Sequence, residues 1–249
     1  MGYNVKFLKF RDGIVDTRIY NRPIITGQVK VGKCKYIRKY KEEENKRRSV
    51  SRSKQSIYEL ARNGLWEWFI TLTFDGSKVD RYDYKAVTKK LSDWLSNLRK
   101  KSPELEYLFV PEQHKDGAYH FHGLVAKLVN VKIVDSGKKC KGETIYNLGS
   151  YRFGFSTMTR VRDNAAVTRY IAKYVTKELL DSTKGRRRYW ASRNLERPAV
   201  DLVQMDPESI CCLWQELEED NVYYNYSQSE YYKVQYYQNR TCEQMFYSV

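Results

Sequence analysis

Residues 107–128 read YLFVPEQHKDGAYHFHGLVAKL, and this stretch predicts a β-hairpin. Two largely apolar runs, Tyr107 to His114 and Ala118 to Leu128, are separated by the three residues Lys115 to Gly117. A three-residue connection with a glycine in the left-handed conformation is a common hairpin turn. The stretch therefore provides two adjacent antiparallel strands from which the rest of the fold can be built.

All three histidines of the chain lie in or beside this hairpin. If Gly117 takes the left-handed position of the turn, Glu112 stands opposite His120. Side chains two residues apart in a strand point to the same face, so His120 and His122 then share one face with Glu112. His114 lies nearer the turn as a reserve ligand. A shift of the register by one residue would turn Glu112 to the other face.

The residue types on this face suit a divalent metal ion. Two neutral imidazoles and one carboxylate leave coordination positions open on an ion such as Mn²⁺ or Mg²⁺, which can then hold phosphate oxygens. We therefore predict Glu112, His120 and His122 as metal ligands. The alternative is that the two strand histidines only make hydrogen bonds within the protein.

The segments on either side of the hairpin predict a mixed fold. Residues 66–74, WEWFITLTF, are rich in aromatic and β-branched side chains and predict a buried central strand. Apolar residues recur mostly at three- and four-residue steps through 84–101, as in an amphipathic helix. Residues 151–161 predict a strand and 163–180 a helix, whereas 130–150 are expected to form a loop insertion.

Three segments are expected along the chain. Residues 1–62 form a basic segment with short strands and a charged helix, residues 63–200 a central domain, and residues 201–249 an acidic, tyrosine-rich extension. The extension is expected to pack against the basic part of the chain or to recruit a partner. A solvated tail that does neither is the alternative.

The charge of the chain points to an anionic partner. Lys and Arg number 45 against 30 Asp and Glu, a net charge of +15, although residues 201–249 hold nine acids and two bases. Such a positive field, interleaved with many Tyr and Trp, favours nucleic acid. In the charged helix before residue 63, basic side chains either contact a DNA backbone or form a solvated face. These side chains are Arg47, Arg48, Arg52 and Lys54.

Residues 169–177 read RYIAKYVTK and contain the element Tyr-x-x-Lys twice. At about 100° per residue, Tyr170, Tyr174 and Lys177 form one stripe of a helix beside an apolar stripe. A phenolic oxygen can attack a phosphodiester if a metal neutralises the non-bridging oxygens and a cation eases phenolate formation. Lys173 and Lys177 can supply such cations. Packing at the edge of the helix is the alternative role for the tyrosines.

In their order along the chain, three elements resemble the HUH endonucleases, specifically the rolling-circle replication initiators of small phages and plasmids. They are Thr71-Leu72-Thr73-Phe74 at the end of a strand, His120-Phe121-His122 preceded by Glu112, and the helix with Tyr170 and Tyr174. The tyrosine spacing is similar to that of the initiators of isometric microviruses and filamentous phages. The resemblance spans roughly residues 66–195, about half of the chain.

This resemblance implies an α+β fold with a ferredoxin-like (RRM-like) antiparallel sheet, helices on one face, and a metal on the central strands. It implies an Mn²⁺- or Mg²⁺-dependent endonuclease and strand transferase that nicks single-stranded or hairpin origin DNA. Cleavage would leave a 5′-phosphotyrosyl link and a free 3′-hydroxyl, so the break can be resealed. Tyr174 is expected to cut first and Tyr170 second, with Arg169 contacting DNA. The sequence contains no P-loop motif, so unwinding is expected from a separate helicase.

Other functions are compatible with parts of the same pattern. A relaxase or single-strand transposase would use the same chemistry, although here the tyrosines follow the histidines. A non-catalytic nucleic-acid-binding module would use the basic surface and the aromatic residues. The sequence has no apolar run of membrane-spanning length and no secretory leader, so we expect no membrane partner and a location in the cytoplasm, that of the host if a phage encodes the chain.

Overall fold

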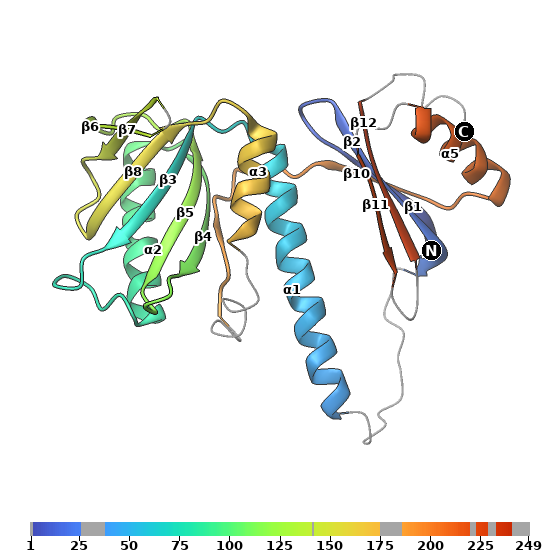
Figure 1. The fold of residues 1–249 in the computed structure, drawn as a ribbon, viewed down its shortest axis with the longest axis horizontal. Coiled ribbons are helices and arrows are strands. Elements are labelled where there is room, and N and C mark those ends of the chain that lie inside the picture. The colour runs from blue at the N-terminus through green and yellow to red at the C-terminus, as the bar shows by residue number, and fades with distance from the viewer. Residues whose placement is uncertain are drawn as a thin grey trace. The chain divides into compact units, whose positions relative to one another are not determined.

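The computed structural model describes residues 2–25, 38–140, 142–174, 186–219, 223–228 and 233–240. The chain forms two compact units (Figure 1). One unit contains both ends of the chain, Met1–Arg38 and Arg197–Val249, and the other contains Lys39–Glu196. This division differs from the three predicted segments, because strands from the two ends of the chain pair within one sheet.

The unit formed by the two chain ends is built on a five-stranded antiparallel sheet with the order β10-β1-β2-β12-β11. Its strands are β1 (Gly2–Lys9), β2 (Ile14–Ile25), β10 (Ala199–Val203), β11 (Tyr223–Gln228) and β12 (Lys233–Arg240). Helix α5 (Pro207–Glu219) contributes Leu213 and Leu217 to a core that includes Val5 and Ile19. The acidic extension thus supplies strands and a helix that complete the fold begun by the first residues.

The second unit is built on a seven-stranded antiparallel sheet with the order β6-β7-β8-β3-β5-β4-β9. Its strands are β3 (Trp68–Phe74), β4 (Glu106–Gln113), β5 (Tyr119–Ala126), β6 (Ile133–Cys140), β7 (Glu143–Leu148), β8 (Gly154–Arg160) and β9 (Trp190–Ala191). Its helices are α1 (Arg38–Asn63), α2 (Tyr84–Lys101) and α3 (Asn164–Lys173). The predicted α+β class is confirmed, and β3 and the β4–β5 hairpin lie at the centre as predicted.

Helices cover both faces of this sheet, whereas helices on one face were expected (Figure 1). Helix α2 packs on one face, against Ile70, Leu72 and Phe121 among others. Helices α1 and α3 pack on the opposite face, against Leu108 and Leu124 among others. Strands β4 and β5 are buried along nearly their whole length, and such two-sided burial requires a cover on each face.

Local sequence explains the ends of α2 and α3. Asp83 caps α2 by accepting a hydrogen bond from the backbone N–H of Lys85, and the helix ends at Lys101, as predicted. Asp163 caps α3 by accepting from the N–H groups of Ala165 and Ala166. The part of the predicted 163–180 helix that follows Tyr174 lies outside the described residues.

Residues 130–150 differ from the expected loop, because most of them form the β6–β7 hairpin at one edge of the sheet. The side chains of β6 are mostly exposed and do not alternate between apolar and polar, so the sequence gives little indication of a strand. Backbone pairing at the edge forms the strand despite this pattern. In the described part of the chain, no helix is long and apolar enough to cross a membrane.

Candidate metal and tyrosine site

The β4–β5 hairpin has the predicted register. The N–H of His114 donates to the carbonyl of Ala118 over 2.9 Å, and Gly117 adopts the left-handed conformation with φ of 87°. Glu112 consequently pairs with His120 across the two strands. The turn therefore places Glu112 on the same face of the sheet as both strand histidines.

Two threonines of β3 orient the histidine rings. Thr71 pairs with His122 and Thr73 with His120, and in each pair the threonine Oγ1 lies 3.1 Å from the histidine Nδ1. These hydrogen bonds leave the Nε2 atoms for other partners. Sequence reasoning placed both threonines only within a family motif. Their spacing of two residues, which matches that of the histidines, is the feature that could have indicated cross-strand partners.

Glu112 lies among three imidazoles. Its Oε2 is 2.7 Å from His122 Nε2 and 3.8 Å from His114 Nε2. The rings of His114 and His120 stack with centroids 3.9 Å apart. The structure therefore brings the three predicted ligands and the reserve ligand to one site.

The environment keeps both strand histidines uncharged. Burial lowers the pKa of His120 to about 4, and the neighbouring His114 and His122 add to this effect. Burial also lowers the pKa of His122, against an opposing contribution from Glu112. Neutral imidazoles are the form that can bind a metal ion.

The donor types fit a divalent ion, but the side chains are paired with one another. The Thr–His hydrogen bonds resemble the outer contacts that fix metal-bound histidines. Within the described residues, however, no group of three or more His, Cys, Asp or Glu side chains is arranged to hold an ion. Glu112 is bonded directly to His122. For both to act as ligands, the carboxylate would have to move away from His122 Nε2.

Helix α3 places both predicted tyrosines over this site. The ring of Tyr174 stacks on His122, with centroids 3.7 Å apart and planes 12° apart. Tyr170 meets the Tyr174 ring edge-on at 5.2 Å and also contacts Phe69. The side chain of Ile171, buried among residues of α1 and the sheet, fixes this orientation of the helix. Tyr170 remains 45% exposed.

The phenol of Tyr174 is held in its protonated form. Burial raises its pKa well above the usual range, and the hydrogen bond with Tyr170 and the charge of Glu112 act in the same direction. Lys173 is exposed on α3. Lys177 lies outside the described residues. A cation beside the Tyr174 phenol would ease phenolate formation.

The predicted DNA-contacting side chains are exposed where the structure describes them. Arg48, Arg52 and Lys54 are exposed on α1, and Arg169 is exposed on α3. The side chain of Arg47 lies outside what the structure describes. These positions are accessible to a nucleic acid, and their role stays a prediction.

The chain thus combines an antiparallel sheet, covered by helices on both faces, with a hairpin whose histidines and glutamate lie beneath two tyrosines. Residues 67–179 match the model of a family described as replication-associated protein ORF2/G2P. The match includes β3, the hairpin and α3, and it supports a role as a replication initiator that binds DNA. No curated protein and no solved structure shows significant similarity to the chain.

Proposed function

We propose that the chain is a replication initiator that nicks single-stranded origin DNA by attack of a tyrosine hydroxyl on a phosphodiester. The observation that carries this proposal is the stacking of Tyr174 on His122. It brings a potential nucleophile directly onto the predicted metal ligands, within the segment similar to replication-associated proteins. A second tyrosine, Tyr170, contacts the first.

The reaction exchanges one phosphate ester for another. The Tyr174 oxygen forms a bond to phosphorus, and the bond from phosphorus to the 3′ oxygen of the preceding nucleotide breaks. The phenolic proton passes to solvent and the leaving 3′ oxygen takes up a proton, so the products are a 5′-phosphotyrosyl link and a 3′-hydroxyl. A divalent ion held by Glu112, His120 and His122 would supply positive charge to the phosphate oxygens and the phenolate.

The two tyrosines differ in a way that supports an order of use. Tyr174 contacts His122, whereas Tyr170 lies one helical turn earlier, contacts Tyr174 edge-on and is more open to solvent. We assign the first cleavage to Tyr174. Tyr170 can then receive a second strand while the first remains attached, which permits repeated rounds of replication. Unwinding is left to a separate helicase.

A denaturing gel with end-labelled oligonucleotides tests this function. The protein is incubated with Mn²⁺ and a pool of single-stranded DNA that carries a fluorophore at either the 3′ or the 5′ end. A 5′-phosphotyrosyl link predicts a slow-migrating labelled adduct only with the 3′ label, and a shortened free fragment with the 5′ label. Sequencing that fragment gives the cleavage site.

Tyrosine variants assign the nucleophile in the same assay. Tyr174→Phe should lose most of the adduct, Tyr170→Phe should keep first cleavage but fail in strand transfer, and the double variant should be inert. Tyr146→Phe is the matched control, because the Tyr146 ring packs on Trp68 in the core on the α2 face of the sheet, opposite to the histidines. An adduct formed by the double variant would refute the proposal, as would DNA binding by the wild type with no adduct.

A further inference from the structure

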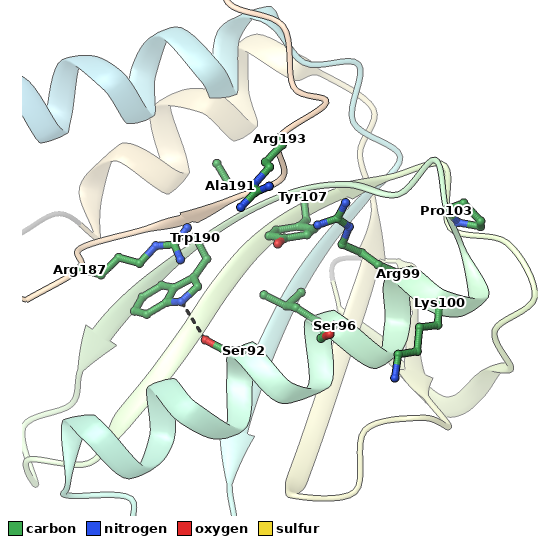
Figure 2. Close-up of a pocket in the computed structure, with 11 residues that line it drawn as sticks. Ser92, Ser96, Arg99, Lys100, Pro103, Tyr107, Arg187, Trp190, Ala191 and Arg193 are labelled. Carbon is green, nitrogen blue, oxygen red and sulfur yellow. Dashed lines mark hydrogen bonds between the residues drawn. The ribbon is translucent and has the colours of Figure 1, made fainter.

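A basic pocket lies on the other face of the same unit, between α2 and the segment around β9 (Figure 2). Its volume is about 650 Å³. Four basic side chains line it: Arg99 and Lys100 from the last turn of α2, Arg187 before β9, and Arg193 after it. The apolar part of the lining includes Trp190 and Tyr107, which belong to the core packed on α2.

The charge of this pocket is not neutralised by neighbouring acids. No Asp or Glu is among the lining residues that the structure describes. None of the ion pairs found in the described ranges includes any of the four bases. All four side chains are exposed. Figure 2 shows that Arg99 and Arg193 extend toward Tyr107 from separate segments. Like charges held close together without a counter-charge favour an anionic ligand.

The segment that carries two of these arginines is fixed to the rest of the unit. Trp190 is only 4% exposed, and its indole N–H donates to the hydroxyl of Ser92 on α2 over 3.3 Å. The Tyr84 hydroxyl donates to the backbone carbonyl of Arg187. The backbone of Ser192 pairs with that of Tyr107. The cations on α2 and beside β9 are therefore held at defined relative positions, as a site for a phosphate backbone requires.

We propose that this pocket binds the sugar-phosphate backbone of single-stranded DNA at a second place, apart from the tyrosine site. Guanidinium groups bind phosphate oxygens through paired hydrogen bonds. Because Trp190 and Tyr107 are buried, the pocket offers no exposed ring for base stacking, so its contacts are with the backbone and independent of sequence. The inference rests on the proposed function only for the identity of the polyanion.

The pocket and the tyrosines are on opposite faces of the sheet. The contribution of the pocket to DNA binding should therefore depend on the length of the strand. Tyr107 and Trp190 pack on the face covered by α2, whereas Tyr174 and His122 are on the face covered by α1 and α3. An oligonucleotide too short to reach around the edge of the sheet can occupy only one of the two sites. A longer strand can occupy both, so the pocket should strengthen binding of long strands beyond what it adds for short ones.

The test compares two pairs of charge-removing substitutions in the full chain. Arg99→Gln with Arg193→Gln removes two charges from the pocket. Lys85→Gln with Lys89→Gln removes two exposed charges from α2 outside the pocket and is the matched control. Both are made in a Tyr170→Phe, Tyr174→Phe background so that cleavage does not disturb binding, and thermal unfolding checks that each variant folds.

Binding is measured by fluorescence anisotropy with oligo(dT) of about 10 and about 40 nucleotides at several salt concentrations. The pocket variant should bind the long strand about tenfold more weakly or worse, with the slope of log K against log salt reduced by about 1.4 for two lost phosphate contacts. The control should lose much less. Equal losses in the pocket and control variants would overturn the proposal, because the effect would then be that of net charge alone.

Adduct formation with the native tyrosines separates this inference from the proposed function. If the wild type forms no adduct but the pocket variant still loses affinity for long strands, the proposed cleavage fails and the pocket stands. If adducts form and the pocket variant binds like the control, the pocket proposal fails alone. Loss of affinity for short and long strands by the same factor would also contradict it, because the second contact would then not depend on strand length.

Discussion

The two faces of the seven-stranded sheet are built from the same strands but have different compositions. On the face covered by α2, β3 places Trp68, Ile70 and Leu72 in a continuous apolar core. On the other face, β3 presents Thr71 and Thr73, which bond to the histidines of β5. Helices α1 and α3 cover only part of this second face. Both faces therefore pack against helices, and the second face also holds the threonine and histidine side chains in fixed positions.

Removing the two strand histidines should have the largest effect. His120→Ala combined with His122→Ala should abolish nicking, because the predicted metal loses two of three ligands. Single-strand binding should be largely unchanged, since it depends on Lys and Arg contacts with phosphates. Adduct gels and anisotropy measure the two properties separately. Full nicking by the double variant would refute the metal site.

A substitution on the opposite face should affect folding rather than chemistry. Phe121 lies between the two histidines, is fully buried, and meets Trp190 and Phe74 edge-on. Phe121→Ala should lower the free energy of unfolding by about 3 to 5 kcal/mol, as measured by denaturant titration. Nicking per folded molecule should be retained at low temperature. Unchanged stability with lost activity would mean that the two faces do not have these separate roles.

Removing the hydrogen-bond partner of one histidine should have a smaller effect. Thr71→Val keeps the shape of the side chain but loses the hydrogen bond to His122 Nδ1. By analogy with outer-shell partners of metal ligands, Mn²⁺ affinity or nicking should fall about 10- to 100-fold. Thr157→Val makes the same change on the adjacent strand, opposite Thr71, and should be nearly neutral. If Thr71→Val and Thr157→Val lowered activity by similar factors, the loss would come from removing a hydroxyl anywhere on this face of the sheet, and not from the bond to His122.

The smallest effect is expected on the part of the histidine-bearing face of the sheet that no helix covers. Phe155 pairs with Thr73, so its ring is on the same face as the histidines, and it is 78% exposed. An exposed ring beside a cleavage site can stack on a base. Phe155→Ala should weaken binding of a cleavable oligonucleotide by about 1 kcal/mol without lowering stability, and Phe155→Trp should restore it. A loss of thermal stability instead would indicate a packing role.

Local patterns in the sequence determined the parts of the fold that could be predicted. The spacing of apolar residues gave the bounds of α2, and the turn from Lys115 to Gly117 gave the register that pairs Glu112 with His120. The bounds of α2 and the register of the hairpin both depend on residues that are close together in the sequence. The proximity of the tyrosines to the histidines came from a family resemblance, and the stacking of Tyr174 on His122 is a finding of the structure.

The features that were not predicted depend on contacts between distant residues. The pairing of β1 with β10 joins segments about 200 residues apart, and nothing local specifies it. A reciprocal pair of hydrogen bonds between the Asn4 side chain and the Met205 backbone makes a second connection of this kind. Helices on both faces could have been inferred from the continuous apolarity of β4, because a strand exposed on one face would alternate.

The absence of a side chain at Gly123 protects the site against misalignment. Gly123 of β5 pairs with Phe109 of β4, and the Phe109 ring fills the space that a Cβ at Gly123 would occupy. A slip of β5 by one residue would turn His120 and His122 toward the apolar core under α2, and the cost of burying polar imidazoles there opposes it. A slip by two residues would keep every face, but it would place Phe121 or Val125 where the Phe109 ring needs an empty position. The missing side chain at Gly123 therefore favours the strand register in which Glu112 pairs with His120, although Gly123 takes no part in the chemistry.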